Sequence, residues 1–314
     1  MAKYLVTGGA GFIGSNIAEE LLNRGEDVRV FDNFSTGNRK NIERLRRNPD
    51  KFEMMEGDLR LASDVAKAVE GVEFVIHQGA LPSVPRSIAD PVNAHETNIT
   101  GTLNILQSAR KFGVKRVVYA SSSSVYGNSE QLPKFEKMPV NPLSPYALTK
   151  YAAEKYCQIF YEIYGLETVS LRYFNVFGPY QDPTSEYSAV IPKFINSIVN
   201  NKSPLIHGDG LQSRDFTYIE NNVQANILAA TKSGIAGEVF NIAIGERYTL
   251  LDLVREINVI LGKNIEPVFS SSRPGDVKHS MADISKAISL MGYKPTCNFK
   301  YGLEKTIDFF VKRG

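Results

Sequence analysis

The chain has 314 residues, of which 36 are Lys or Arg and 34 are Asp or Glu, so its formal net charge is +2. Hydrophobic residues make up 43 % and charged residues 22 %, which is ordinary for a globular protein and excludes a disordered or collagen-like chain. The small net charge gives no broad field for gripping nucleic acid or an anionic membrane, and two Cys residues cannot build a disulfide framework.

Short apolar runs alternate with helical stretches through the first half of the chain. The sequence predicts strands at 4–9, 28–32, 52–58, 72–80, 116–123 and from 167, and helices at 12–24, 63–70, 95–112 and 145–164. Alternation at this spacing predicts an α/β fold, a Rossmann-type doubly wound parallel sheet with helices on both faces. The near-continuous apolar runs FVIH and RVVYA are typical of strands that are covered on both sides.

The regular rhythm ends at about Asn175, where loop-rich segments begin. We therefore predict a Rossmann domain at 1–175 and a smaller C-terminal α/β substrate domain at 176–314, with a strand near 238–243 that rejoins the first sheet. The basic stretch at 39–51 contains acidic residues and no interleaved aromatic residues, which favours a solvated surface helix over a nucleic-acid site.

The N-terminal sequence MAKYLVTGGAGFIG lacks the basic and apolar regions of a signal peptide, and no run approaches the ~18 apolar residues of a membrane span. We expect a cytoplasmic protein that binds neither membranes nor nucleic acid. The histidines show no spacing typical of metal ligands, so no metal is expected; they are His77, His95, His207 and His279.

A glycine-rich turn, TGGAGFIG, follows the first strand. It fits GxGxxG through Gly9, Gly11 and Gly14, and GxxGxxG when Gly8 replaces Gly9. Such a turn lets bare backbone approach a pyrophosphate, and the helix that follows offers its N-terminal N–H groups to the phosphates. The turn lies between a strand and a helix, which favours dinucleotide binding over an ordinary glycine turn.

Asp32 ends the second strand, 18 residues past Gly14. A carboxylate at this place accepts hydrogen bonds from the ribose hydroxyls of NAD and repels the 2′-phosphate of NADP. The sequence thus favours NAD, while Arg39 and Lys40 leave NADP open as an alternative.

The pattern Tyr-x-x-x-Lys places both side chains on one helix face. It occurs at Tyr146/Lys150, Tyr151/Lys155 and Tyr301/Lys305. Context favours the first pair, because Ser144 and Pro145 supply an N-cap and a proline at the first helical position. Tyr146 then lies in the first turn, where the positive helix end, the Lys150 ammonium and a nicotinamide cation favour the phenolate. Upstream, the strand RVVYA ends in four serines at the edge of the sheet where ligands bind in such folds.

With these features in this order, the sequence resembles the extended short-chain dehydrogenase/reductase family. The resemblance runs from end to end through TGGAGFIG, DNFSTG, GDL, NITGT, SSSSVYG, SPYALTK, LRYFNVFGP, SRDFTYI and RPGDVKHSMADISKA. Within that family the chain is most similar to UDP-sugar 4-epimerases, above all those that act on UDP-N-acetylglucosamine. The resemblance implies oxidation of the sugar at C4 to a 4-keto sugar, rotation and re-reduction, with NAD retained throughout.

The resemblance places the catalytic hydroxyl at Ser122 and the catalytic pair at Tyr146 and Lys150. Related 4,6-dehydratases carry Asp-Glu where this chain has Ser123 and Ser124, and UDP-glucuronate decarboxylases tend to carry Glu at the second position. Two hydroxyls cannot perform that acid–base work at neutral pH, which favours epimerisation over elimination. A UDP-N-acetylglucosaminuronate 4-epimerase, a 4,6-dehydratase and a non-catalytic binding protein of the same fold remain as alternatives.

The remaining expectations also come from the resemblance. The cofactor residues are Gly8, Gly11, Phe12, Ile13, Asp32, Asn33, Ser35, Thr36, Gly37, Asp58, Leu59, Gln78, Ala80, Asn98, Tyr146, Lys150 and Tyr173. The substrate residues are Ser83, Ser122, Ser123, Ser124, Tyr146, Asn175, Ala189, Val190, Phe194, Ile206, His207, Arg214, Arg273, Asp276 and Ser280. Ser280 is the small residue that leaves room for an N-acetyl group. A homodimer is implied, formed by the Asn98 and Tyr146 helices of each subunit as a four-helix bundle.

Overall fold

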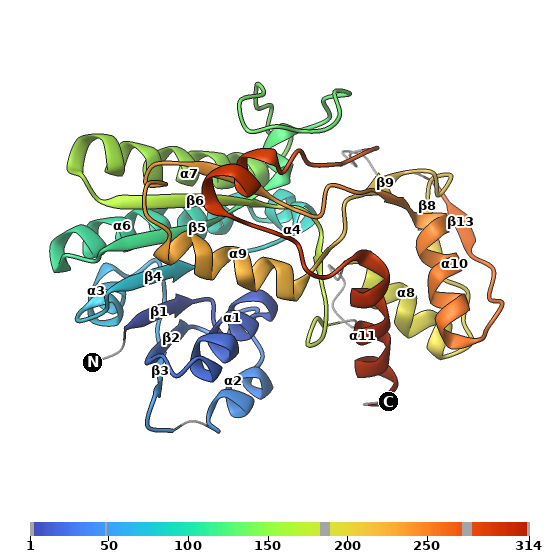
Figure 1. Cartoon of the computed structure of the whole chain (residues 1–314), viewed down its shortest axis with the longest axis horizontal. Helices are drawn as coiled ribbons and strands as arrows, with labels where there is room; N and C mark the ends of the chain where they lie inside the picture. The colour runs from blue at the N-terminus through green and yellow to red at the C-terminus, as the bar shows by residue number, and fades with distance from the viewer. Residues whose placement is uncertain (1–2, 48, 183–188, 272–277, 313–314) are drawn as a thin grey trace.

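A parallel sheet forms the centre of the molecule in the computed structural model, which describes residues 3–47, 49–182, 189–271 and 278–312 (Figure 1). In these residues it has seven strands in the order β11-β6-β5-β4-β1-β2-β3. The strands are β1 (Tyr4–Thr7), β2 (Val28–Asp32), β3 (Phe52–Glu56), β4 (Phe74–His77), β5 (Arg116–Ser122), β6 (Glu167–Tyr173) and β11 (Val239–Ile242). The predicted doubly wound sheet is confirmed, and so is the returning strand, because β11 pairs in parallel with β6.

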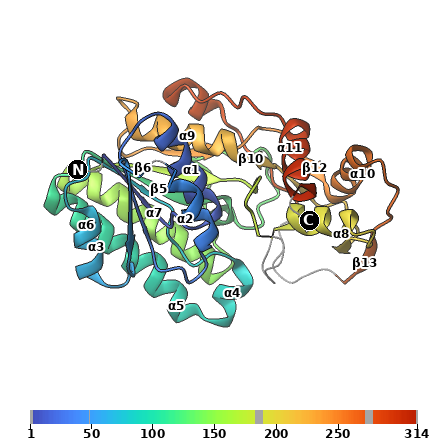
Figure 2. The ribbon, with the colours of Figure 1, turned by 90° about the horizontal axis from the view of Figure 1, so that it is seen from below.

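Helices cover both faces of this sheet (Figure 2). One layer holds α1 (Phe12–Asn23), α2 (Arg39–Leu45) and α9 (Ile219–Thr231), and the other holds α3 (Ala62–Val69), α6 (Gly101–Phe112) and α7 (Pro145–Tyr164). Successive side chains of a strand point to opposite faces of the sheet and so pack against opposite helix layers. Leu5 packs in the cluster with Ile105, whereas Val6 packs with Ile17.

Two predicted helices differ from the structure. The helix expected at 95–112 is a series of α5 (Pro91–His95), a π-helical turn η1 (Glu96–Thr100) and α6. The basic stretch at 39–51 forms only the short helix α2, and it is not solvated all round. Its Arg44 is 8 % exposed and pairs with Glu19 at 3.1 Å, because the helix packs one face against α1.

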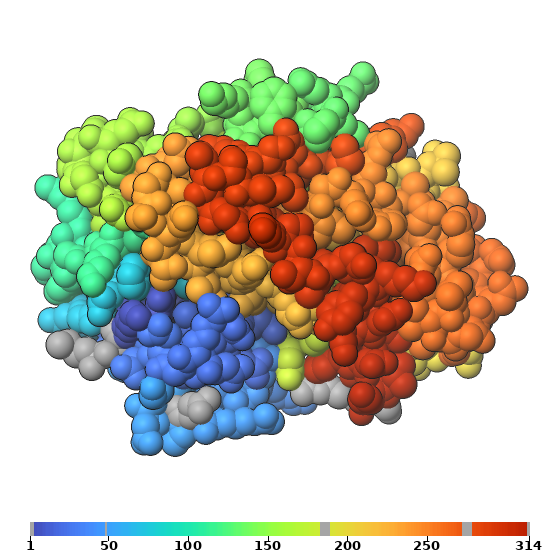
Figure 3. All heavy atoms as spheres, viewed as in Figure 1, coloured from blue at the N-terminus to red at the C-terminus, as the bar shows by residue number. Residues whose placement is uncertain are grey.

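The smaller unit lies beside the carboxyl ends of the strands and contains short two-stranded sheets and three helices in the described residues. Its strands are β7 (Val176–Phe177), β8 (Leu205–His207), β9 (Ser213–Arg214), β10 (Thr217–Tyr218), β12 (Tyr248–Thr249) and β13 (Val268–Ser270). Its helices are α8 (Val190–Val199), α10 (Leu250–Leu261) and α11 (Phe299–Val311). The C-terminal segment (red) lies between the N-terminal region (blue) and α10 (orange) on the face that Figure 3 shows. The segments α9 and β11 follow residue 175 in the sequence but pack with the large sheet. The chain therefore passes between the two units more than once, and the division at residue 175 stays a prediction.

Candidate active site

The glycine turn after β1 leaves a bare backbone surface at the start of α1. Gly8 has φ +65°, and a Cβ there would lie 2.7 Å from the Gly79 Cα atom. A Cβ on Gly14 would collide with the Gly8 carbonyl, whereas one on Gly11 would meet only that carbonyl, at 3.1 Å. No side chain caps the N-terminus of α1, where the predicted residues Phe12 and Ile13 lie. The turn therefore fits a pyrophosphate in the way the fingerprint requires.

Asp32 connects the end of β2 to this turn. Its Oδ2 accepts a hydrogen bond from Ala10 N at 3.0 Å, and its Oδ1 accepts one from Phe34 N at 2.7 Å. Burial raises the pKa of Asp32 above its ordinary value, and the two N–H groups act in the opposite direction. Each oxygen keeps a second lone pair for a ribose hydroxyl. Arg39, which left NADP open, pairs with Glu56 at 3.1 Å instead.

A narrow groove brings eight of the predicted cofactor residues together. Its wall contains Gly8, Asp32, Asn33, Ser35, Thr36, Asp58, Leu59 and Ala80. The sequence analysis missed Phe31, Gly57, Gly79 and Thr97, which line the same groove. Gly37 lies beside it, because a Cβ there would be 2.9 Å from Asp32 Oδ1. A dinucleotide that needs bare backbone, a carboxylate and small polar side chains fits these residues.

Three other predicted cofactor residues bond within the protein. Gln78 Nε2 donates to the Tyr173 hydroxyl at 2.9 Å. Asn98, in the π-helical turn, donates to Thr149 Oγ1 on α7 at 3.0 Å and accepts from Leu81 N at 2.7 Å. Asn98 therefore holds the loop after β4 against the helix that carries Tyr146.

The amino end of α7 brings together the three predicted catalytic residues. Ser144 caps the helix by accepting a hydrogen bond from Ala147 N at 3.1 Å. Lys150 Nζ donates to the Ala120 carbonyl of β5 at 2.8 Å and lies 5.9 Å from the centre of the Tyr146 ring. Ser122, at the end of β5, lies close enough to the Tyr146 phenol to act on its pKa.

The other two Tyr-x-x-x-Lys pairs lie elsewhere. Lys155 bonds to Gln158 on the outside of α7 at 2.9 Å, and Tyr301 lies on α11 with 41 % of its surface exposed. Only the first pair of the three meets the serines at the end of β5.

Burial shifts the pKa values of both Tyr146 and Lys150 in the chain without a cofactor. Burial lowers the pKa of Lys150 to about 7. Burial also raises the pKa of Tyr146, and the nearby Ser122 hydroxyl only partly opposes this. In the chain without the cofactor, desolvation outweighs the helix end and the ammonium, whereas the expected preference for the phenolate also included a nicotinamide cation.

The serines after Ser122 form a short 3-10 turn, η2 (Ser123–Tyr126). Ser124 Oγ donates to Ser122 Oγ at 2.9 Å, so the hydroxyls are linked. Ser83 has φ +88° and caps α4 (Val84–Ala89), because its Oγ accepts a long hydrogen bond from Arg86 N at 3.5 Å. Ser87 of α4, which the sequence analysis missed, accepts a hydrogen bond from Tyr146 N at 2.9 Å. No sequence pattern marks Ser87, because its role depends on the packing of α4 against α7.

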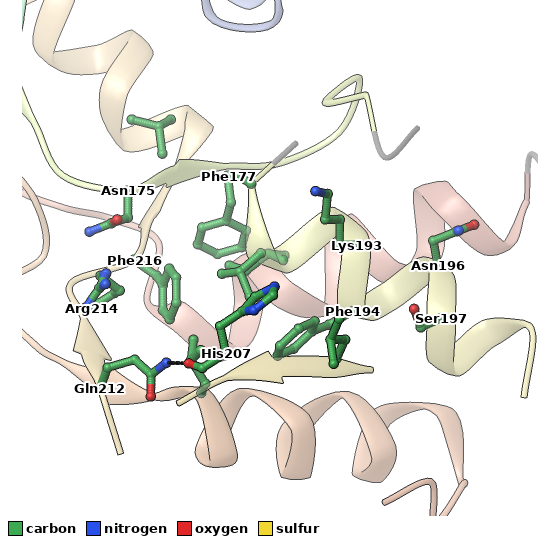
Figure 4. A pocket seen from close by; sticks show the side chains of 16 residues that line it. Asn175, Phe177, Lys193, Phe194, Asn196, Ser197, His207, Gln212, Arg214 and Phe216 are labelled. Carbon is green, nitrogen blue, oxygen red and sulfur yellow. Dashed lines mark hydrogen bonds between the residues drawn. The ribbon is translucent and has the colours of Figure 1, made fainter. Parts of the chain in front are cut away.

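A cavity of about 480 Å³ opens between α8, β8 and β9 (Figure 4). Six of the predicted substrate residues line it: Asn175, Ala189, Val190, Phe194, His207 and Arg214. Ile206 is completely buried behind this wall and does not line the cavity. The lining residues that sequence reasoning missed include Phe177, Lys193, Gln212 and Phe216. Arg273 and Asp276 lie outside the described residues.

Ser280 lies next to this cavity. Its Oγ accepts a hydrogen bond from Asn175 Nδ2 at 3.3 Å, and its N–H donates to Ser213 O at 3.0 Å. The buried carboxylate of Asp215, also missed, accepts hydrogen bonds from the backbone N–H groups of Ile244, Gly245 and Ala282, each at 3.1 Å. Burial raises the pKa of Asp215 to about 7. Asp215 therefore holds the segment that carries Ser280 against β9.

No helix in the described part of the chain is long and apolar enough to cross a membrane. The same residues contain no group of three His, Cys, Asp or Glu side chains that could hold a metal ion.

The chain matches one protein family and is similar to several known proteins. Residues 4–243 match the NAD dependent epimerase/dehydratase family. A UDP-glucose 4-epimerase of Mycolicibacterium smegmatis is 36 % identical over 310 residues, which are 98 % of each chain. Among solved structures, the UDP-N-acetylglucosamine 4-epimerase of Methanobrevibacter ruminantium M1 in complex with UDP-N-acetylmuramic acid has a TM-score of 0.94 and 40 % identity, covering 100 % of this chain and 99 % of its own. The Thermus thermophilus UDP-glucose 4-epimerase in complex with NAD has a TM-score of 0.89 and 35 % identity, covering 98 % and 99 %.

Proposed function

Because the chain belongs to the NAD dependent epimerase/dehydratase family, we propose that it interconverts UDP-N-acetylglucosamine with UDP-N-acetylgalactosamine, and also UDP-glucose with UDP-galactose. The observation that carries this proposal is the group Ser122, Tyr146 and Lys150 with serines, not acids, at 123 and 124. The alternative 4,6-dehydration needs an acid and a base at those two positions, and hydroxyls cannot supply them at neutral pH.

In this mechanism Tyr146 takes the proton from the C4 hydroxyl of the sugar and later returns it. Tyr146 must be the phenolate when it accepts this proton; Lys150 stabilises that phenolate, and Ser122, which acts on the pKa of Tyr146, lies beside the path of the proton. NAD, when bound, supplies the exchange of hydride at C4. Arg214, with its planar fork of donors, and Asn175 hold the diphosphate while the 4-keto sugar turns over.

The preference for N-acetyl sugars rests on Ser280. An acetamido group must pass through the pocket in both ring orientations, and a small side chain leaves that space open. Support comes from the Ser280 hydroxyl, which bonds to Asn175 at the edge of the cavity. A roomy pocket does not strongly exclude the smaller UDP-glucose, so we expect activity on both pairs.

The test is to incubate the purified protein with UDP-N-acetylglucosamine and with UDP-glucose separately, without added NAD, and to separate the products by chromatography. Formation of the 4-epimer of each supports the proposal. A 4-keto-6-deoxy product would show a dehydratase, and no conversion would reject both.

The sugar preference has its own test in Ser280→Tyr, with Ser280→Ala as the control of similar size. We expect the tyrosine variant to lose activity on the N-acetylated pair while it keeps activity on UDP-glucose, and the alanine variant to keep both. Equal retention of both pairs by Ser280→Tyr would remove this basis for the preference. Loss of both, with a lowered melting temperature, would place Ser280 in the packing of the protein.

We further propose a homodimer in the cytoplasm. Both cysteines are buried and unpaired, which suits a reducing compartment.

A further inference from the structure

A buried ion pair lies one turn beyond the catalytic lysine. Glu154 follows Lys150 by four residues and Tyr146 by eight, so all three share one face of α7. Its side chain is 1 % exposed and meets Arg172 of β6 in a two-pronged contact, with Oε1 at 2.6 Å from Nη2 and Oε2 at 3.0 Å from Nε. Such a forked pair fixes direction as well as distance.

The same carboxylate also bonds to the strand that carries Ser122. Ser121 Oγ donates to Glu154 Oε2 at 2.7 Å, and Ser121 lies directly opposite Arg172 in the β5–β6 register. The next residues of the two strands are Ser122 and Tyr173, which are also opposite one another. Glu154 therefore contacts both members of the strand pair immediately before the predicted site.

Arg172 is held on its other sides as well. Its guanidinium lies 4.7 Å from the centre of the Tyr126 ring, and Nη1 donates to the Glu136 carbonyl at 3.2 Å. Tyr126 in turn donates its hydroxyl hydrogen bond to Asn241 of β11 at 2.7 Å. The pair is thus anchored to three neighbouring strands.

We propose that Glu154 and Arg172 are positioning residues that set the position of α7 along β5, and this inference rests on the proposed function. The hydrogen bond of Lys150 to the Ala120 carbonyl crosses from α7 to β5. A slip of the helix by about 1 Å would break this bond and move Tyr146 relative to Ser122, and misplacement of this size costs about 10²-fold in rate. Replacing a buried ion pair by apolar packing often costs no stability, so net stability alone does not explain this pair.

A second Arg–Glu pair on the same two strands, with a more exposed glutamate, serves as the control. Arg116 and Glu167 are opposite one another at the other ends of β5 and β6, and Arg116 Nη2 lies 2.6 Å from Glu167 Oε2. This pair is far along the strands from Ser122, so its loss should affect stability and not the chemical step.

The test compares Ser121→Ala, Glu154→Gln, Arg172→Lys and the control Glu167→Gln. We expect the first three to lower kcat about 10- to 100-fold with KM and bound NAD unchanged, and the control to stay within about twofold. Ser121→Ala keeps the ion pair, so it remains informative if the other variants fold poorly. Arg172→Lys keeps the charge and loses the fork, so full activity in this variant would overturn the inference.

A crystal structure of Ser121→Ala gives a readout that does not depend on turnover. We expect the distance from Lys150 Nζ to the Ala120 carbonyl to exceed the hydrogen-bonding range of about 3.2 Å, and an unchanged distance would overturn the positioning role. If the wild-type protein epimerises no UDP-sugar, the proposed function fails, while this distance still decides whether the pair positions α7.

Discussion

Tyr146 is the residue on which the proposed chemistry depends most directly. Its phenol meets Ser122, and its ring packs near Lys150. Tyr146→Phe removes the proton acceptor and keeps the ring, so we expect activity to fall by about 10²–10⁴-fold with the melting temperature nearly unchanged. The control is Tyr151→Phe on the same helix, which should keep its activity. The opposite pattern would assign the base to the second pair.

Asp32 is the single residue on which the prediction of NAD binding depends most. In Asp32→Asn an amide group replaces one carboxylate oxygen, so an N–H group faces either Ala10 N or Phe34 N, where only an acceptor fits. We expect this variant to lose bound NAD during dialysis, measured by absorbance of the released nucleotide. Asp27→Asn, which changes an exposed carboxylate next to the start of β2, is the control. Equal retention of NAD in Asp32→Asn would contradict the assignment.

A hydrogen-bonded chain of side chains connects β1, β4 and α6. Thr102 Oγ1 donates to the Asn98 carbonyl at 2.6 Å and so accepts from His77 Nε2, while His77 Nδ1 accepts from Thr7 Oγ1 at 2.6 Å. Thr7 Oγ1 accepts in turn from Gly79 N, beside the cofactor groove. With the imidazole neutral, Nδ1 is the acceptor and Nε2 the donor in these hydrogen bonds, and protonation of Nδ1 would reverse the bond with Thr7.

The buried His77 makes these elements sensitive to acid. Burial, with a contribution from the nearby Lys150, lowers the pKa of His77 from 6.5 to about 3. The neutral ring contributes fully to the free energy of unfolding above pH 6.5, the pKa of histidine in the unfolded chain. This contribution is lost as the pH falls toward the pKa of His77 in the folded protein. At about pH 5 the free energy of unfolding has therefore dropped by about 2 kcal/mol. Urea unfolding above pH 6.5 and at about pH 5 should show this loss in the wild type. It should show the same loss in His95→Gln, which changes an exposed histidine. The loss should be absent in His77→Gln, and an equal loss in all three proteins would contradict the prediction.

Elements with strong local signals could be predicted from the sequence. The helix at 145–164 has the same bounds in the structure, because Ser144 and Pro145 start it and Gly165, at φ +71°, ends it. The predicted helix at 95–112 failed at its start, since the π-helical turn around Asn98 depends on contacts with Leu81 and Thr149 that are distant in sequence.

The candidate site divides in the same way. The cofactor groove could be predicted because a strand, a glycine turn and a carboxylate follow one another closely. The roles of Ser87 and Asp215 could not, because their hydrogen-bond partners come from elements that are distant in sequence. Residues that act through long-range packing give no local signal.

At the scale of the whole molecule, α7 carries chemistry on one face and exposed apolar side chains on the other. Leu148, Ile159 and Ile163 are 56 %, 41 % and 68 % exposed and follow one another at helical spacing. The neighbouring α5 adds Val92, which is 65 % exposed. An apolar surface of this kind on a helix pair is typical of an interface between proteins.

The implied homodimer predicts what happens when this surface is charged. Leu148→Glu combined with Ile159→Glu would bury two uncompensated carboxylates at the interface, a cost that dimerisation cannot offset. We therefore expect light scattering to give twice the mass of one chain for the wild type and the mass of one chain for the double variant. Val259→Glu, which charges an equally exposed position on α10 in the smaller unit, should leave the dimer intact. A double variant that stays dimeric would exclude α7 from the interface, and a monomeric wild type would exclude the dimer. Tyr146 and Lys150 lie on the inner face of the same helix. Loss of the partner subunit should therefore also lower the melting temperature of the protein.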